Sequence, residues 1–228
     1  MEIVADVFGV DFRNGRVWAY LYRDGRSFTL IDAGIPGDIG TVRQALKGAG
    51  GDLSDIRQIV LTHHHVDHVG TVAELQRLTG AITLAHTAEA DVVRGKTPPA
   101  PPILSREEKL AFEELSKGMP PAAPAEVHRE LEDGDEIEIG DGARVIHVPG
   151  HTAGSIAIHI PSRGLLFAGD IAVSGETLRM GRFNADPEEA RRSFVKLAEI
   201  DADVACLGHG PPITNDAREA LRAAADRL

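Results

Sequence analysis

One ten-residue stretch, residues 61–70, constrains this chain more than any other part of its sequence. It runs Leu-Thr-His-His-His-Val-Asp-His-Val-Gly, so four histidines and one aspartate fall within six positions. The apolar run 59–61 that leads into it is typical of a buried strand. Imidazole and carboxylate groups together form the ligand set by which proteins bind zinc, iron and manganese. The stretch therefore predicts a metal site beside the end of a strand.

The spacing of the polar residues predicts which of them act together. Side chains alternate along an extended chain, so His63 and His65 point to one side and His64 to the other. Asp67 and His68 follow on a turn and can reach a second position. One short segment can thus supply ligands to two metal ions, whereas His64 is expected to be a packed or hydrogen-bonded residue.

The pattern His63-x-His65-x-Asp67-His68, flanked by Thr62 and Gly70, resembles the signature of the metallo-β-lactamase superfamily. The resemblance requires, later in the chain, a histidine after Pro-Gly, an aspartate after a strand that ends in glycine, and a final histidine after another glycine. All three arrive in this order, as Pro149-Gly150-His151, Gly169-Asp170 and Gly208-His209. The resemblance therefore spans most of the 228 residues.

A fold and a ligand set follow from the resemblance. It implies an α/β fold, a four-layer αββα sandwich of the metallo-β-lactamase type. Two divalent metal ions are the implied cofactors, with Zn²⁺ first and Mn²⁺ or Fe²⁺ as alternatives. The resemblance implies that His63, His65 and His151 bind the first ion and that Asp67, His68 and His209 bind the second. Asp170 would bridge both ions.

The implied reaction is that of a binuclear metal-dependent hydrolase. A hydroxide that bridges the metals attacks the activated carbonyl of a small molecule, such as a thioester, lactone or β-lactam. Asp67 is the candidate catalytic residue because its carboxylate can also orient the attacking water. Glyoxalase II enzymes carry an additional C-terminal helical region, whereas only about 19 residues follow His209 here. The chain thus resembles a glyoxalase II-like or lactonase-like branch.

An oxidoreductase is the alternative. Persulfide dioxygenases are similar to this chain but use one iron held by two histidines and a carboxylate, which here would be His63 or its neighbour, His151 and Asp170. The complete second ligand set favours the binuclear hydrolase.

Bulk properties limit the domain organisation and the partners. A chain of this length fits one domain over residues 1–228. The net charge of −11 disfavours nucleic acid and anionic membranes and leaves a small-molecule substrate as the expected partner. No signal peptide or membrane-spanning run is visible, so a cytoplasmic protein is expected. The single cysteine, Cys206, cannot form an internal disulfide, and its apolar neighbours predict a buried, inert thiol. The oligomeric state is not readable.

Hydrophobic patterning predicts alternating strands and helices. Strands are expected over residues 3–10, 17–22, 27–31, 56–61, 81–85, 136–139, 143–148, 155–160, 164–168 and 204–207. Helices are expected over residues 38–49, 71–78, 105–115 and 186–200 and after a cap at Asn215 or Asp216. Asn14-Gly15 and Asp24-Gly25 predict hairpins. In helix 71–78, Val72, Leu75 and Leu78 are expected to face inward.

Three features outside the ligand pattern have two interpretations each. The proline-rich segment at about 94–125 is interpreted as an insertion that borders the active site, or equally as a plain surface excursion. Asp32 follows a strand and resembles an aspartate that supports the metal ligands, the alternative being a turn aspartate. Arg179 and Arg182 are candidates to contact an anionic substrate group, although solvated surface arginine is the more frequent outcome.

Overall fold

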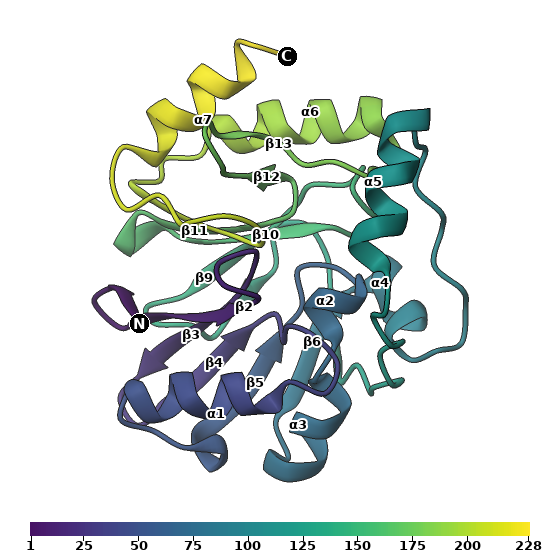
Figure 1. Ribbon diagram of the computed structural model, residues 1–228. Helices are drawn as coiled ribbons and strands as arrows, with labels where there is room; N and C mark the ends of the chain where they lie inside the picture. The colour runs from purple at the N-terminus through teal and green to yellow at the C-terminus, as the bar shows by residue number, and fades with distance from the viewer.

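Two β-sheets lie face to face in the computed structural model, which describes all residues from Met1 to Leu228, and helices cover both outer faces (Figure 1). Helices α1 (Ile39–Gly48) and α3 (Val72–Thr79) lie below the first sheet, and α6 (Pro187–Ala198) and α7 (Ala217–Ala225) lie above the second. The layers follow the order helix, sheet, sheet, helix. This arrangement is the αββα sandwich expected from the sequence.

The first sheet contains seven strands in chain order. They are β1 (Glu2–Val4), β2 (Val7–Phe12), β3 (Val17–Asp24), β4 (Ser27–Ile31), β5 (Ile56–Val60), β6 (Ile82–His86) and β7 (Arg129–Leu131). The first four pair antiparallel through short turns, and the last four pair parallel. Parallel neighbours require a crossover, which α1 and α3 provide.

The second sheet has the order β14 (Val204–Leu207), β11 (Leu165–Gly169), β10 (Ile156–Ile160), β9 (Ala143–His147) and β8 (Glu136–Ile137). Only β11 and β14 pair parallel, and α6 makes their crossover. A separate ribbon pairs β12 (Ala172–Val173) with β13 (Arg179–Met180). The short elements are α2 (Val66–Val69), α4 (Thr87–Val93) and the 3₁₀ turns η1 (Leu53–Asp55) and η2 (Pro161–Arg163).

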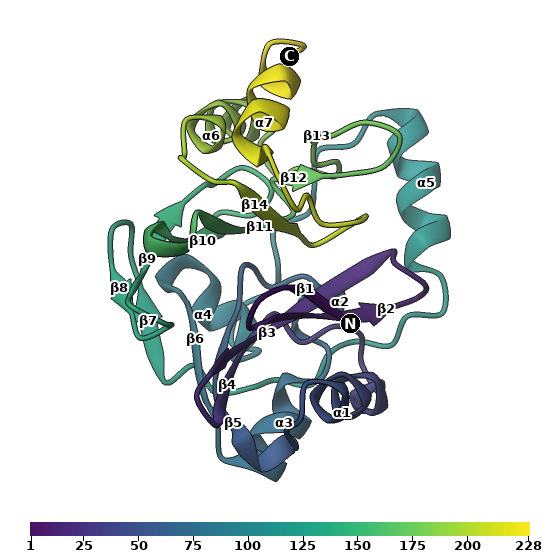
Figure 2. The ribbon, with the colours of Figure 1, turned by 90° about the vertical axis from the view of Figure 1, so that its left-hand side faces the viewer.

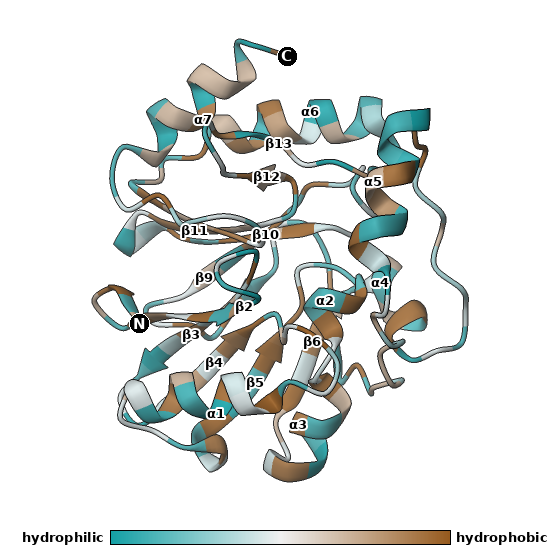
Figure 3. Cartoon of the chain, viewed as in Figure 1, coloured by the Kyte–Doolittle hydropathy of each residue, from teal (hydrophilic) through white to brown (hydrophobic).

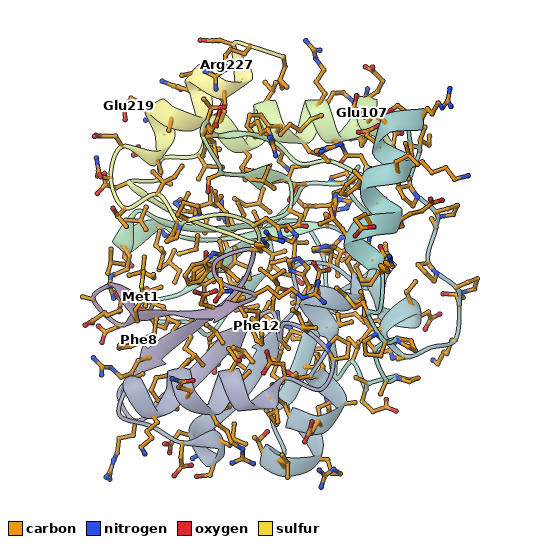
Figure 4. The ribbon with its side chains drawn as sticks, viewed as in Figure 1. Met1, Phe8, Phe12, Glu107, Glu219 and Arg227 are labelled. Atoms are coloured by element: carbon orange, nitrogen blue, oxygen red, sulfur yellow. The ribbon has the colours of Figure 1, made fainter.

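Three apolar clusters fill the spaces between the four layers. One lies between the first sheet and its helices, one between the two sheets, and one between the second sheet and α6 and α7. In Figure 3, brown, the colour of hydrophobic residues, is prominent on β5 and β6, whereas α1 and α3 alternate between brown and teal along their length. Phe12 is fully buried at the end of β2, whereas Glu219 and Arg227 on the last part of the chain point outward (Figure 4). Cys206 is buried in the cluster between the sheets, as predicted, and burial raises the pKa of its thiol.

Most expected elements are present, with three differences. Residues 3–10 form two strands, because Asp6 adopts a left-handed φ of 62° and reverses the chain. Leu78 is 41% exposed and does not face inward, since six residues of helix rotate it about 120° away from Val72. Asp216 precedes α7 as expected, but its side chain makes no capping hydrogen bond.

The proline-rich segment stands outside the four layers. Its helix α5 (Arg106–Ser116) begins at Ser105, which forms a capping box with Glu108. No residue of α5 is fully buried. In two perpendicular views α5 stands at one side of the sandwich (Figures 1 and 2). No helix combines the length and apolar composition needed to cross a membrane.

A hydrogen bond inside the central cluster generates a stability prediction. The hydroxyl of Tyr20 on β3 donates to the Leu207 carbonyl on β14 (2.7 Å) and accepts from the Leu207 N–H (3.1 Å). Tyr20→Phe leaves both buried backbone groups unpaired, so we expect the free energy of unfolding to fall by about 1–3 kcal/mol. Denaturant unfolding measures this change. The control is Tyr22→Phe, whose hydroxyl accepts only from the partly exposed Arg163. Equal losses in the two variants would contradict the expectation.

Candidate metal centre

All seven donors named in the sequence come together at one rim of the two sheets. His63 and His65 follow β5, His151 follows β9, Asp170 follows β11 and His209 follows β14, while Asp67 and His68 lie on α2. They form two groups, in each of which one donor atom per residue lies within 4.8 Å of the others. The first group is His63, His65, His151 and Asp170, and the second is Asp67, His68 and His209.

The first group surrounds a common point. Nδ1 of His65 lies 3.1 Å from Nε2 of His63 and 3.0 Å from Nε2 of His151. Oδ2 of Asp170 lies 3.6 Å from Nε2 of His151 and 3.9 Å from Nε2 of His63. Ligands bound tetrahedrally at 2.0–2.1 Å lie about 3.4 Å from one another. These separations suit a shared divalent cation.

Asp170 also faces the second group. Its Oδ1 lies 3.3 Å from Nε2 of His68, and its Oδ2 lies 2.9 Å from Nε2 of His209. The same nitrogen of His209 is 3.5 Å from Oδ2 of Asp67. One carboxylate therefore connects the two groups.

Two buried atoms in this centre have no hydrogen-bond partner, namely Nε2 of His68 and Oδ1 of Asp170. A buried polar atom left unpaired is costly, and a divalent cation satisfies both a nitrogen lone pair and a carboxylate oxygen. Gly208 keeps the space beside Oδ1 of Asp170 free of side-chain atoms, because a Cβ at position 208 would lie 2.1 Å from that oxygen. The residues present thus fit a divalent metal.

Burial controls the protonation of the first group. It lowers the pKa of His63, His65 and His151, the first two well below the usual value. These imidazoles are therefore neutral at physiological pH. The neutral form is the one that binds metal.

Charge controls the protonation of the second group. Burial lowers the pKa of His209, but the negative charges of Asp170 and Asp67 outweigh it and raise the pKa to about 9. For His68, Asp170 and Asp32 likewise outweigh burial and hold the pKa well above the usual value. Burial raises the pKa of Asp170, but His209 and His68 outweigh it and hold that pKa well below the usual range. The buried carboxylate therefore remains ionised and needs positive charge beside it.

Asp32 orients a ligand, which favours the supporting role over a turn aspartate. It accepts hydrogen bonds from Nδ1 of His68 (2.8 Å), from the Thr62 N–H (2.7 Å) and from the Thr62 hydroxyl (2.7 Å). Because Nδ1 of His68 donates to this carboxylate, Nε2 is the nitrogen that can bind a metal, once its proton is released.

Asn184 and Glu89 were not singled out by the sequence. Oδ1 of Asn184 lies 3.2 Å from Nδ1 of His151. Glu89 on α4 is buried and joins the two loops that carry the three histidines of the first group. It accepts from the His64 N–H (2.8 Å), the Gly154 N–H (2.7 Å) and the Thr152 hydroxyl (2.9 Å), and its carboxylate also pairs with the His64 ring. His64 is thus a hydrogen-bonded residue beside the site, as expected.

A cavity of about 320 Å³ opens above the donors. His65, Asp67, His151, Asp170 and His209 form its polar floor. The proline-rich segment contributes Phe112, Leu115, Ser116 and Met119 to the walls. This segment therefore lies beside the donors, and its role at an active site stays a prediction.

Comparison with known sequences identifies relatives over the whole chain. The family described as the metallo-beta-lactamase superfamily matches residues 13–209. A probable metallo-hydrolase of Bacillus subtilis is 30% identical over 245 positions, which cover 100% of this chain and 92% of that protein. A hydroxyacylglutathione hydrolase of Fuscovulum blasticum is 34% identical over 196 positions, which cover 84% of this chain but only 62% of that enzyme. The chain thus spans about three fifths of the length of that enzyme.

Solved structures with this fold include two similar proteins. A variant of a metallo-beta-lactamase from Cronobacter sakazakii has a TM-score of 0.71 and 26% identity, with 92% of this chain and 79% of that chain covered. A metallo-beta-lactamase family protein from Thermus thermophilus has a TM-score of 0.73 and 24% identity, with 99% of this chain and 80% of that chain covered. At this identity the likeness shows the fold alone. The predicted fold and the predicted enzyme class, a metal-dependent hydrolase, are confirmed. With a family match from residue 13 to residue 209, this chain belongs to the metallo-beta-lactamase superfamily.

Proposed function

We propose that this chain is a binuclear metal-dependent hydrolase that cleaves an activated acyl bond of a small molecule. The observation that carries the proposal is the position of Asp170. Its Oδ1 lies 3.3 Å from a nitrogen of the second donor group, and its Oδ2 lies 3.6 Å from a nitrogen of the first. A single carboxylate between two histidine groups suits two ions held side by side.

Each donor has a role in this proposal. His63, His65 and His151 hold the first ion, and Asp67, His68 and His209 hold the second, with Asp170 shared. When bound, two divalent ions, Zn²⁺ before Mn²⁺ or Fe²⁺, lower the pKa of water and stabilise negative charge that develops on a carbonyl oxygen.

The chain's own groups position the reaction. Asp67 is partly exposed and lines the cavity, so its carboxylate can accept a hydrogen bond from the attacking water. Nδ1 of His209 donates to the Arg16 carbonyl (2.6 Å), which directs Nε2 toward Asp170 and Asp67. Relatives named hydroxyacylglutathione hydrolases support the thioester as the first substrate to test. Lactones and β-lactams are the next candidates.

Activity and metal content test the proposal together. Protein purified without added metal is expected to carry two divalent ions per chain and to hydrolyse at least one activated acyl compound. Loss of activity with a chelator and recovery with Zn²⁺ or Mn²⁺ are also expected. Elemental analysis and a screen over thioesters, lactones, β-lactams and phosphodiesters measure these outcomes. One iron per chain with oxygen uptake on a persulfide would instead establish the dioxygenase.

Variants of two donors test the shared position of Asp170. Asp170→Asn is expected to lower metal retention in both groups and to reduce kcat by more than about 100-fold, since loss of an outer partner alone costs 10- to 100-fold. His209→Ala is expected to leave one ion per chain, because only the second group includes it. His159→Ala is the control, since His159 bonds only the Asp201 carbonyl. Equal metal content in the Asp170 and His209 variants would contradict the shared role.

A third test concerns Glu89 as a positioning residue. In Glu89→Gln an amide N–H₂ replaces one of the oxygens that accept from His64, Thr152 and Gly154. We expect the affinity for the metal of the first group to fall about 10- to 100-fold. Metal titration of the folded variant measures this effect. Glu130→Gln is the control, because Glu130 is exposed and bonds only Thr87 and Arg94. A lower free energy of unfolding with unchanged metal affinity would reduce Glu89 to a structural role.

A further inference from the structure

We infer that the cavity binds an amphipathic acyl thioester, with an apolar acyl chain on the α5 side and a thiol part that carries at least two negative charges on the arginine side. The inference rests on the proposed hydrolase function and names the substrate class of the same site.

The first observation is a convergence of arginines. Arg13, Arg16, Arg179 and Arg182 line the cavity, and none of them has a carboxylate oxygen within 4.0 Å. They come from separate parts of the chain, the β2–β3 hairpin and the segment around β13. The hairpin and the β12–β13 ribbon lie on opposite sides of the space beside α5 (Figure 2).

These arginines make the cavity wall positively charged, although the chain as a whole is negatively charged. The whole chain has a net charge of −11, yet the only acidic residues in the cavity wall, Asp67 and Asp170, belong to the donor groups. Guanidinium is weakly hydrated and binds carboxylate and phosphate through two parallel hydrogen bonds. Four such groups, none of them in an ion pair, suit a ligand with several negative charges.

Arg182 also has an aromatic contact. Its guanidinium carbon lies 5.1 Å from the centroid of the Phe183 ring, within the range of a cation–π contact. A guanidinium held over a ring loses less freedom when it binds an anion.

The second observation is an apolar wall beside the arginines. Phe112 and Leu115 lie three residues apart, on one face of α5, and Met119 follows just after the helix. The Phe112 ring meets Phe183 edge to face at 5.3 Å, whereas Leu115 is 53% exposed. An acyl chain laid on this wall removes apolar surface from water, which strengthens binding about fourfold per methylene group. The volume of about 320 Å³ is at the lower end for ligand pockets, so the charged part of the substrate extends to the rim.

The reaction is a hydrolysis and is balanced without a redox partner. Water adds its oxygen to the carbonyl carbon, the C–S bond breaks, and the thiol leaves with a proton. The products are a carboxylate and a free thiol.

Thioesters matched in charge and chain length test the inference. The probes are octanoyl-coenzyme A, acetyl-coenzyme A, octanoyl-glutathione and the neutral octanoyl-N-acetylcysteamine, all with metal-loaded protein. We expect kcat/KM for octanoyl-coenzyme A to exceed that for acetyl-coenzyme A and for the neutral thioester by about tenfold or more. The glutathione probe distinguishes carboxylates from phosphates as the source of the charge.

Variants assign the two parts of the substrate. Arg13→Gln and Arg179→Gln are each expected to reduce the preference for charged over neutral octanoyl thioester by about tenfold. Leu115→Gln is expected to reduce the preference for octanoyl over acetyl. Arg43→Gln is the matched control, because Arg43 is exposed on α1 and remote from the cavity lining.

Two results separate this inference from the proposed function. Equal hydrolysis of charged and neutral thioesters, unchanged in the arginine variants, would overturn the substrate class and leave the hydrolase intact. The S-octyl thioether of coenzyme A has no carbonyl group and cannot be hydrolysed, and calorimetry measures its binding. Arginine-dependent binding of this thioether, with no hydrolysis of any acyl compound, would support the site and overturn the hydrolase.

Discussion

The apolar contact between the two sheets sets the position of every donor in the candidate site. Ile31 and Val60 of the first sheet and Ile158 and Phe167 of the second are fully buried in this contact. The first sheet and α2 supply four donors and the second sheet supplies three, so each donor group takes residues from both halves of the fold. Neither half contains a complete group by itself. Packing between the sheets is therefore a condition for the site as well as for stability.

Buried polar residues complete what the apolar contact begins. Asp32 holds His68 from the first half, and Glu89 joins the loop of His63 and His65 to the loop of His151. A buried carboxylate is costly unless hydrogen bonds and charges compensate it. Both of these carboxylates accept hydrogen bonds from several N–H and O–H groups. Their hydrogen bonds fix the directions of the rings, which is what a centre with two groups of donors only a few ångströms apart requires.

The sequence was sufficient for the ligand pattern and most of the fold. The donors His63 to His68 lie within six residues, so local spacing revealed them. The later donors, which follow glycines at strand ends, were assigned through the resemblance to the metallo-β-lactamase superfamily. Glu89 and Asn184 carry no such signal. A glutamate in the first turn of a helix usually faces solvent, and the partners of Glu89 lie 25 and 63 residues away. The turn at Asp6 was missed because a left-handed aspartate interrupts an otherwise continuous strand pattern without a glycine.

Helix α5 stands apart from the layers that hold the donors together. It buries none of its residues fully, yet Phe112, Leu115 and Ser116 form part of the cavity wall. Its sequence can change without opening any of the three apolar clusters, because none of its residues belongs to them. This segment is therefore an exchangeable module, both in evolution and in protein engineering. Replacing it can alter which compounds enter the cavity while the metal ligands stay the same.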